Sequence, residues 1–338
     1  MKRDDEAVAE RAGKIARAAL AMPLERAVSL LKVAGEPTRL RLLALLSAGD
    51  LNVSDLTEVL GQSQPRISRH LKLLVEARLI ERYQEGSWAY YRLAGNDAVA
   101  LVRPVLERLD PEEEDLARDA ERLAALRARH ADTAAAYFAR NATDWDKIRV
   151  LHAPEETVER AMREMVGETP VHSMLDLGTG TGRLLELFAD LYTEALGIDS
   201  SREMLAIARA RLVREGLTRA RVRRGDILGT EVPRGRFDLV TMHQVLHFLD
   251  RPREAVREAV RALAPGGRLL IVDFAPHGHE FLRESQAHRR LGFPPDTVAD
   301  WITDAGAAVE RVETVPSDGP DGLTVVLWAA RDPRLQLA

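Results

Sequence analysis

Apolar residues recur every three or four positions through much of the first hundred residues, which is the spacing of helices that bury one face. The pattern predicts a helix over residues 23–34 and a second that opens at Pro37, in the first turn where proline's missing N–H is harmless. Asn52 has the spacing of a capping box for a third, short helix, which Gly61 ends. Ser63 is then expected to cap a fourth helix. A bundle of short helices therefore begins this chain.

A change to alternating positions follows the fourth helix. Residues 79–83 and 88–93 have the pattern of two strands joined by a glycine-bearing turn, and residues 99–109 return to helical spacing. Helix, tight turn, helix and hairpin together are the organisation of a winged helix-turn-helix. We expect an α+β domain of this kind at residues 23–110, preceded by a charged helical arm at residues 1–22.

The rest of the chain divides into a linker and an α/β region. Residues 111–147 predict a helical linker whose heptads are too irregular for a coiled coil, although it could lie at a dimer seam. From residue 148 to 338, helices alternate with short apolar strands, which is typical of a parallel sheet in a Rossmann-like domain. The expected strands are 173–177, 194–199, 221–226, 237–242, 268–274, 309–315 and 324–329.

Composition narrows the class of protein. The 338 residues are 46% hydrophobic and 30% charged with a net charge of −5, so the chain is globular and any nucleic-acid site must be a local basic patch. There is no cysteine, which excludes disulfides and thiolate metal sites. The charged start shows no signal peptide, and no apolar run is long enough to span a bilayer. These features favour the cytoplasm.

The fourth helix offers a surface for DNA. Burial of Ile67, Leu71, Leu74 and Val75 would turn its polar residues outward. Arginine and glutamine can pair with base edges, while lysine and serine suit phosphates. The candidate DNA contacts are Gln64, Arg66, Ser68, Arg69 and Lys72 on the helix and Arg82, Trp88 and Tyr90 on the hairpin. A helical bundle with an ordinary solvated face is the alternative, because arginine is abundant throughout this chain.

Three motifs strengthen the DNA-binding interpretation: PTRLRLL at 37–43, SRHLKLL at 68–74 and YYRL at 90–93. Together they resemble the ArsR/SmtB family of bacterial repressors, over about residues 23–108. The resemblance implies a homodimer, formed through the first and last helices of the domain, that binds an inverted-repeat operator in double-stranded DNA.

The metal inputs of that family have no match here. The positions of its Cys-x-Cys site correspond to Asn52 and Ser54, which offer no soft ligand. The family's second site uses Asp and His on the dimer helix, and residues 97–110 contain no histidine. No metal site is predicted.

A second pattern, MLDLGTGTGR at 174–183, combines an apolar strand, a glycine turn and a helix start. Arg183 stands where the dinucleotide fingerprint has its third glycine, so a pyrophosphate site is disfavoured. Asp199 ends the next strand about 20 residues further on, where a carboxylate can accept hydrogen bonds from ribose hydroxyls. Asp226 is expected to end the third strand beside the same crevice.

This region resembles class I S-adenosylmethionine-dependent methyltransferases over about residues 170–330, which implies a mostly parallel seven-stranded sheet. A doubly wound fold with another ligand is the alternative. By the resemblance, Asp176, Gly178 and Gly180 would surround the methionine part and Asp199 would bind the ribose. The remaining implied contacts to S-adenosylmethionine or S-adenosylhomocysteine are Ser200, Met204, Asp226, Ile227 and His243.

The sequence is compatible with both a catalytic and a non-catalytic methyltransferase-like domain. The tip of the fourth strand lacks Asn/Asp-Pro-Pro-Tyr, so methylation of DNA is not expected, and no catalytic residue is assigned. His243 or His247 could be a base or could only pack. The loop setting of His277, His279 and His288 favours solvated histidines over metal ligands. Tyr137 and Trp145 could cover the pocket.

The joined chain resembles two-domain ArsR-type regulators of the methionine cycle that sense S-adenosylhomocysteine. The resemblance implies repression of genes that recycle S-adenosylmethionine, tuned by the nucleoside. An alternative is an active small-molecule methyltransferase that regulates itself through its DNA-binding domain. A third possibility keeps the winged helix for dimerisation only.

Overall fold

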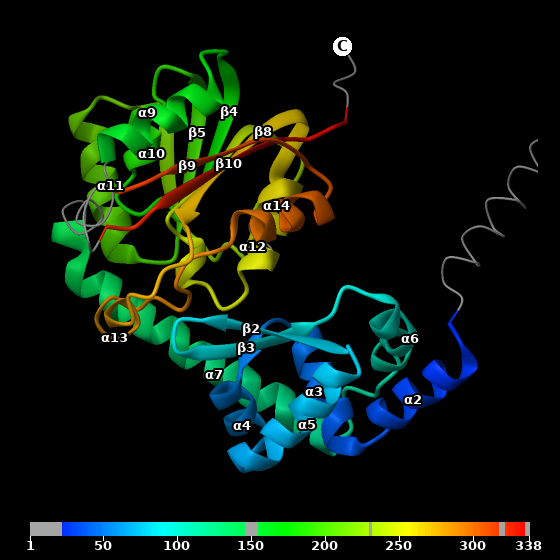
Figure 1. Ribbon diagram of the computed structural model, residues 1–338. Helices are drawn as coiled ribbons and strands as arrows, with labels where there is room; N and C mark the ends of the chain where they lie inside the picture. The colour runs from blue at the N-terminus through cyan, green and yellow to red at the C-terminus, as the bar shows by residue number, and fades with distance from the viewer. Residues whose placement is uncertain (1–21, 146–154, 230–231, 318–321, 335–338) are drawn as a thin grey trace, which may run out of the picture. The chain divides into compact units, whose positions relative to one another are not determined.

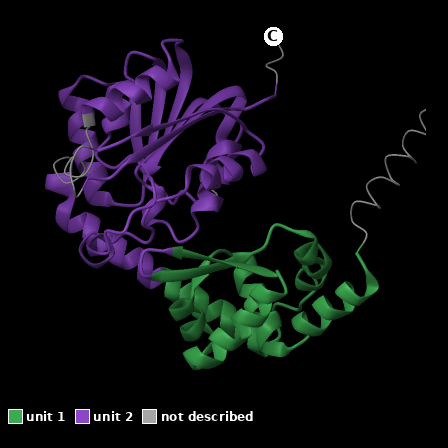
Figure 2. Ribbon diagram, in the orientation of Figure 1, with its two compact units in different colours: residues 1–84, 88–127 green, residues 85–87, 128–338 purple. Residues whose placement is uncertain are grey.

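A computed structural model describes residues 22–145, 155–229, 232–317 and 322–334. The chain divides into two compact units, which Figure 2 colours separately. The N-terminal unit comprises residues up to 84 together with 88–127, and the C-terminal unit comprises 85–87 together with 128–338. The predicted N-terminal arm lies outside the described residues, except for its last residue, Met22.

The N-terminal unit has the expected order of helix, turn, helix and hairpin (Figure 1). Its first helices are α2 (Leu24–Ala34), α3 (Pro37–Ser47), α4 (Val53–Leu60), α5 (Gln64–Glu76) and α6 (Asp97–Leu106). Its strands are β1 (Leu51–Asn52), β2 (Ile80–Glu85) and β3 (Trp88–Leu93), in the sheet order β1-β3-β2. The winged helix-turn-helix prediction is confirmed in its elements.

Helix α4 begins with a complete capping box. The Asn52 side chain accepts a hydrogen bond from the Asp55 N–H at 2.9 Å, and the Asp55 carboxylate accepts one from the Asn52 N–H at 3.4 Å. Gly61 ends the helix in the left-handed region, with φ of 62°. Ser63 occupies the N-cap position of α5 as expected, but its side chain makes no capping hydrogen bond. The turn between α4 and α5 is therefore defined mainly by Asn52 and Gly61.

The long helix α7 (Glu114–Asn141) occupies most of the predicted linker, residues 111–147, and its two halves belong to the two units. Leu123 and Leu126 are buried in the core of the N-terminal unit. The Arg41 guanidinium donates two hydrogen bonds, of 2.7 and 2.6 Å, to the buried carboxylate of Asp119. The division between the two units falls inside this helix, after Arg127. The first half of α7 is thus part of the N-terminal domain's core.

The C-terminal unit contains a seven-stranded sheet in the order β6-β5-β4-β7-β8-β10-β9 within the described residues. Its strands are β4 (Val171–Leu177), β5 (Tyr192–Asp199), β6 (Ala220–Arg224), β7 (Phe237–His243), β8 (Leu263–Phe274), β9 (Ala308–Val315) and β10 (Val325–Arg331). Strands β4 to β8 run parallel, and β10 is antiparallel to both of its neighbours. Each of the seven overlaps a predicted strand, although β8 begins five residues before its predicted start and β6 ends two residues before its predicted end. The Rossmann-like fold class is confirmed.

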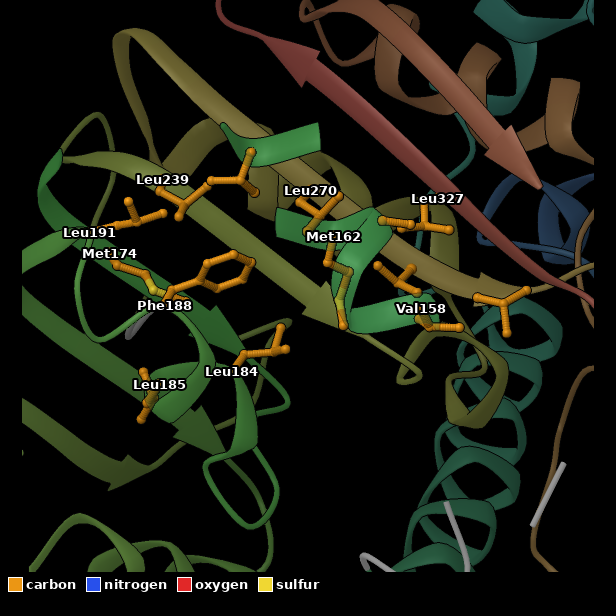
Figure 3. Packing of buried hydrophobic residues seen from close by; sticks show 14 of the residues in the cluster. Val158, Met162, Met174, Leu184, Leu185, Phe188, Leu191, Leu239, Leu270 and Leu327 are labelled. Carbon is orange, nitrogen blue, oxygen red and sulfur yellow. The ribbon is translucent and has the colours of Figure 1, made fainter. Parts of the chain in front are cut away.

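Helices cover both faces of this sheet. They are α9 (Glu155–Val166), α10 (Arg183–Leu187), α11 (Arg202–Arg214), α12 (Pro252–Ala262), α13 (Phe281–Ser285) and α14 (Pro295–Asp304), with short 3-10 turns η1 (Ala142–Asp144) and η2 (Leu246–Phe248). Figure 3 shows one core layer, where Met162 of α9 and Leu184 of α10 meet Met174 of β4 and Leu327 of β10. Residues of α12 and α14 fill the layer on the other face. None of the described helices is long and apolar enough to cross a membrane.

Candidate DNA-binding surface and nucleoside site

Helix α5 presents a polar face to solvent. Ile67, Leu71 and Leu74 are fully buried, Val75 is partly buried and His70 lies 3.4 Å from Glu36, so the remaining positions point outward. The five predicted contact residues of this helix are all exposed: Gln64, Arg66, Ser68, Arg69 and Lys72. Lys72 lies 3.8 Å from Glu76, whereas Arg66 and Arg69 form no ion pair with any described residue. Two guanidinium groups are therefore available for an external anion.

The hairpin contributes unequally to this surface. Arg82 of β2 is exposed and donates to the Gln84 side chain at 3.0 Å. Trp88 is partly buried. Tyr90 is only 2% exposed, and its ring stacks on Tyr83 with centroids 5.7 Å apart. Arg82 suits an external contact, while the Tyr90 ring packs the hairpin.

Three left-handed glycines shape the loop after β4. Gly178, Gly180 and Gly182 have φ of 72°, 52° and 81°, a region that residues with a Cβ rarely adopt. A Cβ on Gly178 would also lie 2.5 Å from the side chain of Val245. The glycine spacing in the sequence therefore has two physical causes, backbone conformation and close packing.

Asp199 fastens the tip of β5 to this loop. Its carboxylate accepts a hydrogen bond from the Gly180 N–H at 2.9 Å and another from the Ser201 N–H at 2.8 Å. Burial raises the pKa of Asp199, and these backbone hydrogen bonds oppose the rise. The structure thus brings together Gly180 and Asp199, two of the predicted ligand residues.

Asp176 is the second carboxylate of the site. It is 2% exposed and accepts a hydrogen bond of 2.7 Å from the Thr241 hydroxyl of β7. Burial raises the pKa of Asp176 to about 6, against the lowering effect of hydrogen bonds from Thr241 and Thr179. A cation placed beside this carboxylate would favour its charged form. Asp176 and Asp199 therefore suit a ligand that carries hydroxyl groups and a positive charge.

The other predicted ligand residues differ in accessibility. Met204 is buried on α11, whose first turn is capped by the Ser201 hydroxyl, and Ser200 is exposed. Asp226 is exposed, two residues beyond the observed end of β6, and accepts from the Leu228 N–H at 2.9 Å. The expectation that Asp226 ends the third strand is wrong by that margin. Ile227 is buried in a core layer.

The tip of β7 carries a feature that the sequence pattern does not reveal. His243 is the last residue of the strand and is partly buried. Gln244 follows with φ of 52°, a left-handed conformation that is uncommon outside glycine, and its N–H donates to the Val272 carbonyl at 2.7 Å. No periodicity or motif predicts such a backbone at glutamine.

A buried histidine lies just beyond this tip. His247 is 1% exposed, and its Nδ1 is 2.7 Å from the carboxylate of Asp273, which is itself fully buried. Asp273 also accepts from the Leu246 and Phe274 N–H groups. This arrangement satisfies a buried carboxylate and holds the histidine ring in one orientation.

The prediction of solvated histidines after β8 is wrong for His288. That residue is buried, and its ring stacks on Phe274 with centroids 6.0 Å apart. Burial lowers the pKa of His277 to about 4, so its ring is neutral at pH 7. Packing of this loop against Phe274 explains the burial, which loop composition could not indicate. The described residues contain no cluster of His, Asp or Glu that could hold a metal ion.

Trp145 lies against the glycine loop. Its indole nitrogen is 3.8 Å from the position that a Cβ on Gly180 would occupy. The ring packs on Phe138 of α7 and on Phe248, with centroid distances of 5.3 and 6.2 Å. Tyr137 joins this aromatic group. The end of α7 and the segment after it therefore contact the candidate ligand site.

Comparison with known proteins agrees with this division. Residues 36–82 match the family model of bacterial regulatory proteins of the arsR family, and residues 175–271 match the model of a methyltransferase domain. The chain therefore joins an ArsR-type helix-turn-helix region to a class I methyltransferase domain.

Individual relatives match one region or the other. The arsenical resistance operon repressor of Escherichia coli (strain K12) is 47% identical over 68 residues, covering 20% of this chain and 58% of that protein. The uncharacterized methyltransferase YcgJ of Bacillus subtilis (strain 168) is 33% identical over 106 residues, covering 31% of this chain and 42% of that protein. The chain spans about half the length of the curated relatives it matches. The crystal structure of YcgJ is 20% identical, covers 54% of this chain and 100% of that chain, and has a TM-score of 0.46.

Proposed function

We propose that this protein is a transcriptional repressor whose methyltransferase domain senses S-adenosylhomocysteine or S-adenosylmethionine and thereby controls genes of the S-adenosylmethionine cycle. The observation that carries the proposal is the Asp199–Gly180 hydrogen bond, within a left-handed glycine loop, in a chain that also has an ArsR-type region. The hydrogen bond and its glycine loop support a nucleoside ligand, and the ArsR-type region supports operator binding.

In the N-terminal unit, α5 is the proposed recognition helix. Arg66, Arg69 and Gln64 would face base edges or phosphates in the major groove, with Ser68 and Lys72 on the backbone. Arg82 on the hairpin would hold a phosphate or enter a minor groove. The absence of ion pairs at Arg66 and Arg69, among the described residues, supports this assignment because no internal partner must be displaced.

A homodimer is the proposed binding form. Helix α2 exposes Leu24 (79%), Val28 (40%) and Leu31 (48%), although the apolar spacing there resembles a buried stripe. Helix α6 lies beside α2 and exposes Val105. Exposed apolar residues on two adjacent helices support an interface with a second copy.

In the C-terminal unit, Asp199 would accept hydrogen bonds from the ribose hydroxyls and Asp176 would face the ammonium of the methionine part. Gly178 and Gly180 permit close approach of the backbone to the ligand. Ser200 and Met204 would lie near the ribose, Asp226 and Ile227 would border the adenine, and His243 would lie at the margin of the site. Both carboxylates suit either S-adenosylmethionine or S-adenosylhomocysteine, since the two share these groups.

Helix α7 is the proposed transmitter. Its first half is anchored through Asp119 to Arg41 in the N-terminal unit. Its second half is anchored in the C-terminal unit, where His130 lies 3.1 Å from Asp250 and Phe138 packs on Phe248. A ligand at the glycine loop would change the environment of Trp145, which packs on Phe138. Regulation requires that the ligand bind the DNA-competent and DNA-free forms with different affinities.

The test is operator binding in the presence of each nucleoside. A duplex selected for tight binding from a random pool is titrated with the full chain, alone and with S-adenosylmethionine or S-adenosylhomocysteine. A change in affinity of about tenfold, equivalent to about 1.4 kcal/mol, is expected for at least one of them. No response to either, together with methyl transfer to a small-molecule acceptor, would favour a self-regulating methyltransferase instead.

A further inference from the structure

The surface formed by α11 and the edge strand β6 has an unusual charge. Residues 202–224 contain eight arginines and two glutamates, a net charge of +6 in a chain whose net charge is −5. Five of these arginines are exposed and form no ion pair with any described carboxylate: Arg202, Arg209, Arg219, Arg221 and Arg224. Arg219 donates to the carbonyl of Ala189 and lies over the Tyr192 ring, 5.9 Å from its centroid, and Arg224 donates to the carbonyl of Ser200. We call these five residues the α11–β6 arginine surface, which follows the outer edge of the sheet, because Arg221 and Arg224 are three residues apart in β6 and point to its opposite faces.

Arginine abundance alone does not explain this surface. Most other arginines of the C-terminal unit are neutralised by a carboxylate, as in Arg253–Asp304 at 2.7 Å and Arg331–Glu310 at 2.6 Å. Elsewhere in the C-terminal unit, the exposed arginines without a described ion pair include Arg140, Arg160 and Arg257, which lie on three separate helices. A general excess of arginine would scatter the unpaired residues, whereas four of the five lie on two packed elements, α11 and β6, and Arg219 lies in the turn that joins them.

Protection of the sheet edge is also an incomplete explanation. Charged side chains on an edge strand prevent pairing with other chains, and this could account for Arg221 and Arg224 on β6. It does not account for Arg202 and Arg209 on α11. These two are seven residues apart and therefore lie on one side of the helix, separated by about 10 Å along its axis. Their line is continued by Val213, which is 82% exposed.

We propose that the α11–β6 arginine surface binds the sugar-phosphate backbone of double-stranded DNA without reading its sequence. Several guanidinium groups without a carboxylate partner suit a row of phosphates, because arginine is always charged and presents its donors in a fixed fork. The choice of duplex DNA rests on the proposed function, since operator binding by the N-terminal unit would raise the local concentration of duplex around the tethered methyltransferase domain. This domain would then add non-specific, salt-dependent affinity to the specific contacts of α5.

Helix α11 also connects this surface to the nucleoside site. Its outer side carries Arg209, while Met204 is buried on the inner side and Ser201 caps its first turn. Arg224 donates to the carbonyl of Ser200, the residue that follows Asp199. Phosphate binding and nucleoside binding would therefore engage opposite sides of one helix.

The test compares three full-length proteins for binding to a duplex of random sequence. The surface variant combines Arg209→Ala, Arg219→Ala and Arg221→Ala, and Arg202 and Arg224 are retained because they adjoin the proposed ligand residues. The matched control combines Arg140→Ala, Arg160→Ala and Arg257→Ala, which removes the same charge from exposed, dispersed positions. Fluorescence anisotropy between about 50 and 200 mM salt gives the affinity and its salt slope.

The surface variant should lower the salt slope by about 2 to 3, since each lost phosphate contact contributes about 0.9, and should weaken binding at least about fivefold at the lower salt. The control should remain within about twofold of the unmodified chain. Equal binding by the two variants would overturn the proposal. The same titrations are repeated with heparin and with single-stranded RNA. The proposal would also be overturned if the surface variant bound these two polyanions more weakly but bound duplex DNA as tightly as the unmodified chain. A set of Arg→Gln substitutions at the same positions, which keep most of the side-chain stems, repeats the test if the alanine variant melts early.

A recognition-helix variant, Arg66→Ala with Arg69→Ala, separates this inference from the proposed function. If it leaves all DNA binding unchanged while the surface variant weakens it, the operator-binding proposal fails and the arginine surface stands. If the recognition-helix variant weakens DNA binding and the surface variant does not, the operator-binding proposal stands and the arginine surface is rejected.

Discussion

The two candidate sites of this protein are built in opposite ways. The DNA-binding surface consists of exposed side chains on one regular helix, α5, whose other face is apolar and buried. The candidate nucleoside site combines three left-handed glycines with two carboxylates, those of Asp176, the penultimate residue of β4, and Asp199, the last residue of β5. One site is a property of a helix surface, and the other is a property of backbone geometry and burial.

This difference separates function from stability in one unit and couples them in the other. An exposed arginine such as Arg69 can be removed with little effect on folding, because surface substitutions usually change stability by less than about 0.5 kcal/mol. Asp176 is different, because burial raises its pKa to about 6. Its ionisation at neutral pH therefore destabilises the folded chain. Variants of the two sites should therefore behave differently in unfolding experiments.

Replacement of Asp199 should have the largest effect. Asp199→Ala removes the proposed ribose acceptor and the partner of the Gly180 and Ser201 N–H groups. The ribose hydroxyls would lose two charge-assisted hydrogen bonds to the carboxylate, each worth about 1.5–3 kcal/mol, and this loss should weaken nucleoside binding at least about hundredfold. Isothermal calorimetry with S-adenosylhomocysteine measures this effect. Retained affinity would remove Asp199 from the ligand site, and Asp199→Asn, which keeps a side-chain acceptor for the loop, separates charge from loop geometry.

Replacement of Asp176 should show the coupling between the site and stability. The raised pKa means that Asp176 contributes stability below its usual value of 3.8 and loses it as pH rises through about 6. The difference between the pKa of about 6 in the folded chain and the usual value of 3.8 corresponds to about 3 kcal/mol, at about 1.36 kcal/mol per pKa unit. Asp176→Asn should therefore raise the free energy of unfolding of the ligand-free protein at pH 8 by up to this amount, relative to its effect at pH 4. Urea unfolding at the two pH values decides, and an equal effect at both would contradict the raised pKa.

Replacement of Arg69 should have the smallest energetic effect, confined to DNA. Arg69→Ala should weaken operator binding by about 1–3 kcal/mol and, if the contact is to phosphate, reduce the salt slope by about one. Its melting temperature should stay unchanged, unlike that of Asp176→Asn. Arg140→Ala is the matched control in anisotropy titrations, since Arg140 is exposed on α7. Unchanged operator binding would mean that α5 is not the recognition helix.

The local structure of both candidate sites could be predicted from the sequence because its determinants are local. The Asn52 capping box, the buried face of α5 and the glycine spacing after β4 each depend on residues within a few positions of one another. The seven strands of the C-terminal sheet were predictable for the same reason, since a run of apolar residues identifies a strand before its neighbours are known.

Other features could not be predicted because they depend on residues distant in sequence. Tyr90 occupies a hairpin position typical of a DNA contact, yet it is buried against Tyr83. His288 lies in a loop but packs on Phe274. The left-handed backbone of Gln244 follows from its hydrogen bond to Val272 on the next strand, and no signal in the sequence indicates it.

The sequence by itself determined most of the helices and strands and which residue types are available for DNA and nucleoside. Short-range sterics, capping and apolar periodicity are sufficient for these. Only the tertiary structure decided that the first half of α7 belongs to the N-terminal core, that Asp199 is tied to Gly180, and that five arginines between residues 202 and 224 lack a described carboxylate partner. Burial, ion pairing and pKa depend on which distant side chains come together, and that information exists only once the chain has folded.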